Sequence, residues 1–99
     1  MEAIIESKNN EVVGVLEYII EKDYIELRST FVNGKFRHKG YGTKLYLKLE
    51  RIAKKENKPI YVNSDADPKK ESFGKFLTKM GFKYYNLPRQ DFPWRKKIK

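Results

Sequence analysis

The spacing of hydrophobic and polar positions divides the chain into a first part that predicts strands and a second part in which predicted helices alternate with strands. Up to residue 32 the apolar residues fall in three short runs, "AIIES" at 3–7, "EVVGVLEYIIE" at 11–21 and "YIELRSTFV" at 24–32. These runs are rich in β-branched residues and predict three strands. The first two flank "KNN", a polar break that favours a turn, so we expect a hairpin whose second strand is largely buried.

The third of these strands is expected to alternate regularly between two faces. One face would hold Tyr24, Glu26, Arg28, Thr30 and Val32. The other face would hold Ile25, Leu27, Ser29 and Phe31.

From Gly42 the period becomes helical. Apolar residues follow at i, i+4, i+7 and i+8, namely Leu45, Leu49, Ile52 and Ala53. This spacing predicts an amphipathic helix with a lysine-rich outer face. The helix is expected to end at "ENKP", because Asn57 can adopt a left-handed cap and Pro59 cannot continue a helix.

The rest of the chain predicts a strand, a second helix and two closing strands. "PIYVNS" at 59–64 would be a strand parallel to the third one. Asp67 is expected to cap the second helix, with Pro68 in its first turn and Gly81 at its end. The apolar side of this helix would consist of Phe73, Phe76, Leu77 and Met80.

The closing strands would be "FKYYNL" at 82–87 and "WRKKI" at 94–98. The order is therefore β-β-β-α-β-α-β-β, a mixed α/β (α+β) fold. No repeat or linker divides residues 1–99, so a single domain is expected. In the last strand Trp94 and Ile98 would face the core, although Trp94 could also border a binding site or a dimer interface.

Composition narrows the chemistry that the chain can perform. It has no cysteine and one histidine, which excludes disulfides, thiolate metal sites and a cysteine nucleophile and argues against any histidine-based metal centre. We therefore expect no metal. The N-terminus begins acidic and has no long apolar stretch, so we expect neither a signal peptide nor a membrane span, and a cytoplasmic location.

Charge is distributed unevenly over the net +9 of the chain. Residues 1–26 hold seven acidic residues and two lysines, a net charge of −5, whereas residues 27–99 carry a net charge of +14. This division favours an anionic ligand at one side and a cationic one at the other. Nucleic acid is a rival candidate for the partner of the basic part.

The stretch "FRHKGYGTKL" at 36–45 is a candidate phosphate-binding turn. It joins a strand to a helix, whose first amides are unpaired and suit an anion. Gly40 and Gly42 would allow close approach of the backbone and a positive φ. Position 45 is leucine, so this is not the dinucleotide-binding G-x-G-x-x-G motif, and it lacks the G-K-[ST] of a P-loop. An ordinary strand-to-helix turn is the alternative.

The surrounding sequence resembles a known family. "RHKGYG" fits R/Q-x-x-G-x-G/A, the acyl-CoA pyrophosphate motif of the GNAT superfamily of N-acetyltransferases. Downstream, "FGKFLTKMGFKYY" is similar to the second signature of that family, a helix ending before Gly-Phe and a strand. The two signatures occur in the right order with a strand between them, and the resemblance covers about three-quarters of the chain.

The resemblance implies where acetyl-CoA would bind. In that family the strand before the motif and the strand after the first helix diverge, and the pantetheine arm lies between them. Phe31 and Val32 would contact pantetheine through their backbone. The backbone amides of His38, Lys39, Gly40, Tyr41, Gly42 and Thr43 would bind the pyrophosphate, and Arg37 would fix the turn.

Two departures from the family pattern are visible. The family usually has two helices between its first two strands, and they form much of the acceptor site. Only 23 residues precede the third strand here, so both helices are expected to be missing. Many members also have a tyrosine four residues before the Gly-Phe pair that protonates the leaving thiolate; that position is Leu77.

The resemblance also implies candidate catalytic residues. Glu26 is at the position of the general base in the histone-acetylating branch of the family, and its alternative role is an ion pair with Arg28 or a lysine. Glu17 is the reserve base. Tyr84 is our candidate for the acid that Leu77 cannot supply, with Tyr85 and Ser72 as alternatives.

The sequence thus predicts an N-acetyltransferase that moves acetyl from acetyl-CoA to a primary amine. The acidic hairpin would face a cationic acceptor: a lysine or N-terminus of a protein, a polyamine or another small amine. A homodimer is also considered. The alternative is a non-catalytic module of this fold that binds nucleic acid or CoA through its basic face.

Overall fold

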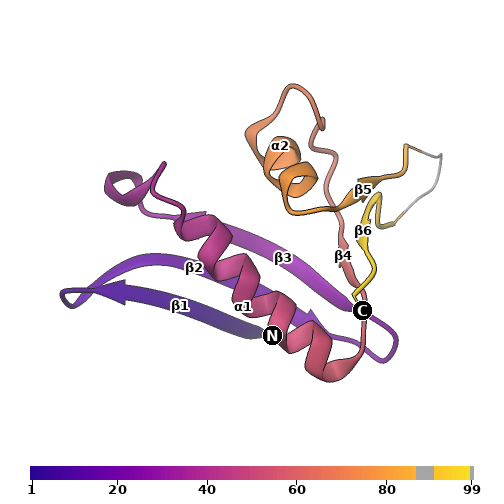
Figure 1. The fold of residues 1–99 in the computed structure, drawn as a ribbon, viewed down its shortest axis with the longest axis horizontal. Helices are drawn as coiled ribbons and strands as arrows, with labels where there is room; N and C mark the ends of the chain where they lie inside the picture. Colours follow the sequence, from indigo (N-terminus) through magenta and orange to yellow (C-terminus); the bar gives the residue numbers. More distant parts are fainter. Residues whose placement is uncertain (87–90, 99) are drawn as a thin grey trace.

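The computed structural model of the protein describes residues 1–86 and 91–98. One six-stranded sheet with the order β1-β2-β3-β4-β6-β5 runs through these residues (Figure 1). Its strands are β1 (Glu2–Lys8), β2 (Glu11–Ile20), β3 (Ile25–Val32), β4 (Ile60–Val62), β5 (Lys83–Tyr84) and β6 (Trp94–Lys96). The helices are α1 (Tyr41–Glu56) and α2 (Ser72–Lys79), with a short 3-10 turn η1 (Gly34–Phe36) before α1. The predicted order of elements is confirmed. Residues 87–90, which include parts of the predicted strand 82–87 and of its connection, lie outside the described residues.

The first two strands form the predicted hairpin. β1 and β2 pair antiparallel, and Asn9 and Asn10 in the turn have positive φ values of 52° and 64°. Asparagine tolerates this left-handed conformation, and two such residues fit the twist of a tight hairpin. β3 pairs antiparallel with β2 and, as predicted, parallel with β4.

The regular alternation predicted for β3 is wrong. Glu17 of β2 pairs with Ser29 and the next residue, Tyr18, pairs with Leu27, so that Arg28 is an extra residue in β3. Such a bulge exchanges the faces of the strand beyond it. Leu27 is buried and Val32 also packs on the core, whereas Phe31 is 55% exposed.

Helix α1 covers one face of the β1–β2–β3 part of the sheet (Figure 1). Its predicted inner residues Leu45, Leu49 and Ala53 are fully buried against the sheet. The helix ends at Asn57, which has the predicted left-handed conformation with φ 56°. The two-layer core positions the N-terminus of α1 beside the end of β3.

Helix α2 begins later than predicted. Its N-cap is Glu71, and Asp67 instead caps a separate turn, because its Oδ1 accepts from the backbone N–H groups of Lys69 (2.7 Å) and Lys70 (3.0 Å). The capping chemistry of Asp67 was recognised correctly, but the element that it caps is the turn before the helix. Leu77 on the inner side of α2 is fully buried.

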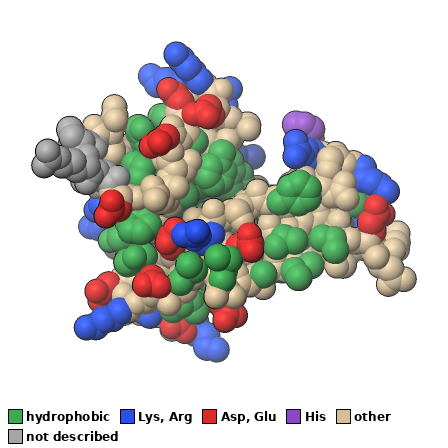
Figure 2. All heavy atoms as spheres, turned by 180° about the vertical axis from the view of Figure 1, so that it is seen from behind, with side chains coloured by type: hydrophobic (Ala, Val, Ile, Leu, Met, Phe, Trp, Pro, Cys, Tyr) green, Lys and Arg blue, Asp and Glu red, His purple; other side chains and the backbone are tan. Residues whose placement is uncertain are grey.

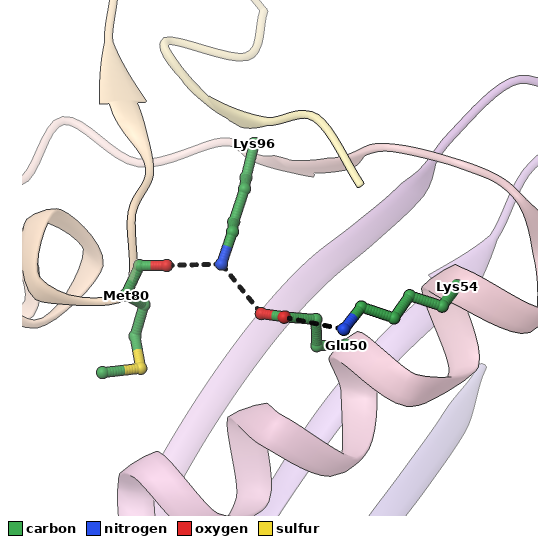
Figure 3. A network of polar contacts seen from close by, with 4 residues as sticks. All are labelled: Glu50, Lys54, Met80 and Lys96. Atoms are coloured by element: carbon green, nitrogen blue, oxygen red, sulfur yellow. Dashed lines mark hydrogen bonds and ion pairs between the residues drawn. The ribbon is translucent and has the colours of Figure 1, made fainter. Parts of the chain in front are cut away.

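The closing strand is fixed to α1 by a polar contact. Lys96 of β6 donates from Nζ to Glu50 Oε2 of α1 (2.8 Å) and to the carbonyl of Met80 (2.6 Å), and Lys54 lies 3.7 Å from the same carboxylate (Figure 3). On the same face of β6, two residues before Lys96, Trp94 is fully buried. Of the roles considered for Trp94, the structure therefore supports that of a core residue.

Candidate functional site

A cleft of about 610 Å³ opens where β3 and β4 diverge. The two strands pair only at Ile25 with Ile60 and at Glu26 with Tyr61, and beyond this point they separate (Figure 1). Residues 28–32 of β3 form one wall of the cleft, and residues 36–38 and 40–42 form its outer end. Backbone groups of β3 that would otherwise pair with β4 are thus available to a ligand.

The outer end of the cleft is the N-terminus of α1. Gly40 has φ 83° and caps the helix without any side-chain hydrogen bond. The amides of the first helical turn have no intrahelical acceptor and carry the positive end of the helix dipole. Tyr41 and Gly42 line the cleft directly. This end of the cleft has the chemistry of an anion site.

Two further polar groups of β3 and the turn face this region. Arg37 donates from Nε to the carbonyl of Val32 (3.1 Å), which ties the turn to the end of β3. Thr30 lines the cleft, and its buried Oγ1 has no hydrogen-bond partner among the described residues. This hydroxyl is a buried polar atom beneath the cleft wall whose hydrogen-bonding capacity is unused.

The opposite wall comes from α2 and was not identified from the sequence. Ser72, Phe73 and Phe76 line the cleft, and the two phenylalanine rings stack at 6.5 Å. The helical spacing assigned both phenylalanines to the core. Their position depends on the divergence of the strands, which leaves the outer half of the apolar side of α2 facing the cleft.

The predicted turn residues do not all reach the cleft. His38 lines it, with a positive φ of 63°, whereas Lys39 and Thr43 are not among its lining residues. Lys39 is exposed, so its side chain can act on a bound anion only through long-range attraction.

Two carboxylates, Glu26 and Glu17, lie near the inner end of the cleft, but neither is among its lining residues. Glu26 lies where the strands part, its side chain is 13% exposed, and Arg28 Nη1 is 3.2 Å from its Oε2. Arg28 itself lines the cleft. Glu17 lies on the neighbouring strand and accepts from Ser29 Oγ at 2.7 Å. Both candidate bases are therefore near this end, and Glu26 also has the ion pair considered as its alternative role.

The three candidate proton donors differ in their position relative to the cleft. Tyr84 packs against Trp94, with ring centroids 4.9 Å apart, and does not line the cleft. Tyr85 points away from the core and is 40% exposed. Of the three residues considered, Ser72 is the one that lines the cleft.

The acidic hairpin is partly neutralised by the protein itself. Glu6 binds Lys48 and lies 3.5 Å from Lys44, both on α1, and the hydrogen bond from Lys48 holds the pKa of Glu6 below its usual value. Glu11 pairs with Lys35 at 2.7 Å. The charge of the hairpin is thus smaller in the fold than the sequence suggests.

The described residues contain neither a candidate metal cluster nor a helix that could span a membrane. Within residues 1–86 and 91–98, no three His, Cys, Asp or Glu side chains are grouped so that they could hold a metal ion. No helix in the described part of the chain has the length and apolar character needed to cross a membrane.

The family follows from a comparison of the sequence with family models. The model of the acetyltransferase (GNAT) family matches residues 2–82. The chain belongs to the GNAT acetyltransferase family. The cleft therefore lies where two strands of a GNAT fold diverge, and the resemblance found in the sequence is confirmed.

Solved structures of GNAT proteins have the same fold. The PaiA N-acetyltransferase from Thermoplasma acidophilum, solved with coenzyme A, is 28% identical with a TM-score of 0.70 over 92% of this chain. Tetrahymena GCN5 is 19% identical, with a TM-score of 0.76 over 98% of this chain and 68% of its own. The chain spans 57% of the length of the Thermoplasma protein.

A third structure has almost the same extent as this chain. The anti-CRISPR protein AcrVA5 is 17% identical with a TM-score of 0.69, and the match covers 96% of this chain and 98% of that one. The compact form of the fold is therefore found in another solved protein. Among curated proteins, no match to this sequence was found.

Proposed function

We propose that this protein transfers acetyl from acetyl-CoA to a primary amine. One observation carries the proposal: the cleft runs from an uncapped helix N-terminus at Gly40 to Arg28 of β3, whose Nη1 lies 3.2 Å from the carboxylate of Glu26. An anion site at one end and a base at the other are what an acyl-CoA and an amine require. Membership of the GNAT acetyltransferase family supports this reading.

The residues of the cleft fit acetyl-CoA as co-substrate. The amides at the start of α1 suit a pyrophosphate, and the open edge of β3 near Phe31 and Val32 suits an amide-containing arm. When bound, the thioester would supply an activated acetyl group.

The chain would contribute proton transfer and charge stabilisation. Glu26 would accept the proton of the acceptor ammonium, after which the C–N bond forms and the C–S bond breaks. A backbone N–H of β3 near Phe31 or Val32 would stabilise the developing oxyanion. The attacking nitrogen would lose its second proton as the amide forms, and the leaving thiolate, whose conjugate acid has a pKa of about 8.5, would take up this proton directly or by relay through water or Ser72. Tyr84 would need to act from outside the cleft lining.

A protein is the acceptor that we favour, through a lysine or its N-terminus. The sheet face opposite α1 has no helix over it and carries exposed apolar side chains, among them Ile5 and Phe31 (Figure 2). An exposed apolar patch beside a cleft is typical of a protein contact site. Polyamines and other small amines remain the alternative acceptors. We also propose that residues 1–99 act as one cytoplasmic domain. A homodimer stays a prediction, which analytical ultracentrifugation would test.

The proposal is tested by turnover of Glu26→Gln beside the matched variant Glu17→Gln. CoA release would be followed with a lysine peptide and with spermidine as acceptors. Loss of the base should lower turnover at least about 100-fold while leaving acetyl-CoA affinity nearly unchanged. Glu17→Gln should lose less than about fivefold.

Two results would contradict this assignment. Full activity of Glu26→Gln would exclude Glu26 as the general base. A larger loss of turnover in Glu17→Gln than in Glu26→Gln would assign that role to Glu17. Tight acetyl-CoA binding without CoA release from any amine would instead support the non-catalytic alternative.

A further inference from the structure

A second cavity, of about 430 Å³, lies at the β4–β6–β5 end of the sheet and shares no lining residue with the cleft. Figure 1 shows these three strands on the far side of the molecule from the β1–β2 hairpin. The side chains around the cavity are cationic or aromatic: Tyr61, Lys83, Tyr85, Arg95, Lys96 and Lys97. No acidic residue is among the described residues that line it.

The strand register brings like charges together here. Lys83 of β5 and Arg95 of β6 are direct cross-strand partners, and Lys97 lines the same cavity. Like charges directly opposite each other are unfavourable in a sheet. Lys96 is bound by Glu50 (Figure 3), but within the described residues neither Lys83 nor Lys97 has an ion-pair partner. The fold therefore leaves positive charge concentrated around this cavity.

Two aromatic rings at this cavity contact the guanidinium of Arg95. The Arg95 guanidinium lies 5.1 Å from the ring centroid of Tyr61 and 5.7 Å from that of Tyr85, and its Nε donates to the carbonyl of Phe92 (3.0 Å). These contacts hold the guanidinium in place over two rings. Tyr85 is 40% exposed, so part of its ring is open to solvent.

We propose that this cavity binds single-stranded nucleic acid, with phosphates at Lys83 and Lys97 and a base against Tyr85. Cations that follow a phosphate backbone, combined with an exposed aromatic ring for stacking, are the features of such sites. An acidic peptide would use the lysines but would gain little from the tyrosine. The net charge of +14 on residues 27–99 would add long-range attraction. The inference is independent of acetyl transfer, because the two cavities are separate.

Fluorescence anisotropy with a labelled 15-nucleotide oligo(dT) would test the proposal. Affinity should fall as salt rises, with a log–log slope of about −2 for two or three phosphate contacts on a single strand. Lys83→Ala with Lys97→Ala should weaken binding at least about tenfold. The matched control removes the same charge at Lys69 and Lys70, which are exposed and line neither cavity, and should keep most of the affinity.

The contribution of stacking is tested separately with Tyr85→Leu, which keeps an apolar side chain and so protects the fold. It should weaken oligo(dT) binding at least about fivefold. Saturating acetyl-CoA should leave oligo(dT) binding unchanged, and this result would support a site outside the cleft.

Any of four results would overturn the proposal: no oligo(dT) binding at low salt; full affinity in Tyr85→Leu; displacement by acetyl-CoA; or poly-glutamate binding as tightly as oligo(dT). UMP binding as tightly as oligo(dT) would overturn the assignment to a strand and indicate a free nucleotide. Failure here would leave acetyl transfer untouched, since that activity is measured by CoA release.

Discussion

Helices α1 and α2 differ in what surrounds their first turns. At the start of α1, Gly40 takes a left-handed conformation, no side chain caps the helix, and the first turn opens onto the cleft. At the start of α2 no side chain caps the helix either, but the chain before it is folded into a turn, in which the N–H of Glu71 donates to the carbonyl of Asp67 at 3.2 Å. The start of α1 thus presents backbone to the cleft through two glycines, whereas the start of α2 is packed against the turn before it.

Both helices have a glycine in their first turn, but for different reasons. A Cβ on Gly74 in α2 would lie 2.1 Å from the carbonyl oxygen of Asp67, so glycine there makes room for the backbone. A Cβ on Gly42 in α1 would meet only side chains, Phe76 at 3.6 Å and Val32 at 4.0 Å. Glycine there leaves room in the cleft. The difference teaches that a glycine near a helix start indicates a ligand site only when the space beside it is empty.

Gly74→Ala is expected to have the largest effect on stability. The added methyl would clash with backbone that cannot move without breaking the turn at Asp67, so unfolding free energy should fall by about 3 kcal/mol. Urea denaturation would measure it. A variant as stable as the wild type would show that the turn before α2 is not packed as described.

Gly42→Ala is the matched substitution on the other helix and should act on binding instead. Alanine favours a helix over glycine by up to about 1 kcal/mol, so stability should hold or rise. The methyl would narrow the cleft between Val32 and Phe76, and acetyl-CoA should bind about tenfold more weakly. Equal affinity in calorimetry would argue that the ligand does not pass this point.

The smallest expected effect concerns the ion pairs that attach α1 to β1. Because the hydrogen bond from Lys48 lowers the pKa of Glu6 from 4.5, this carboxylate stabilises the fold above its unfolded pKa. The stabilisation is lost as pH falls through the lower folded value. Glu6→Gln should lower the free energy of unfolding by less than about 1 kcal/mol at neutral pH. The loss of stability toward acidic pH should also become less steep than in the wild type.

Urea unfolding at several pH values would measure this effect. Glu2→Gln on the same strand, where the side chain is exposed, is the control and should keep the wild-type slope. An unchanged slope in Glu6→Gln would mean that the pairs with α1 contribute nothing.

The sequence predicted the elements of the fold well because periodicity and capping are local. Leu45, Leu49 and Ala53 were placed correctly in the core, and the end of α1 at Asn57 followed from residue chemistry. The faces of β3 were not predictable in this way. The bulge at Arg28 depends on how β2 and β3 pair, which no local pattern within β3 reveals.

The candidate site was predictable where a contiguous motif forms it. The turn around Gly40 is such a motif, and its left-handed conformation was expected from glycine. Phe73 and Phe76 were missed because their helical spacing is that of a core helix, and only the divergence of β3 and β4 exposes them to the cleft. Tyr84 was selected for its chemistry alone, and packing turned it toward Trp94.

The central claim is that the uncapped start of α1 binds the phosphates of acetyl-CoA, and one calorimetric comparison tests it most directly. Acetyl-CoA would be titrated into the wild type, Gly40→Asp and Gly34→Asp. A Cβ meets nothing within 4 Å at either position, so both variants add one charge without a clash. Gly40→Asp also strains the backbone, because φ at Gly40 is 83°, although aspartate tolerates a left-handed conformation better than most residues. We predict micromolar binding by the wild type and Gly34→Asp, and a loss of at least about 100-fold in Gly40→Asp. Equal affinity of Gly40→Asp and the wild type would contradict the account.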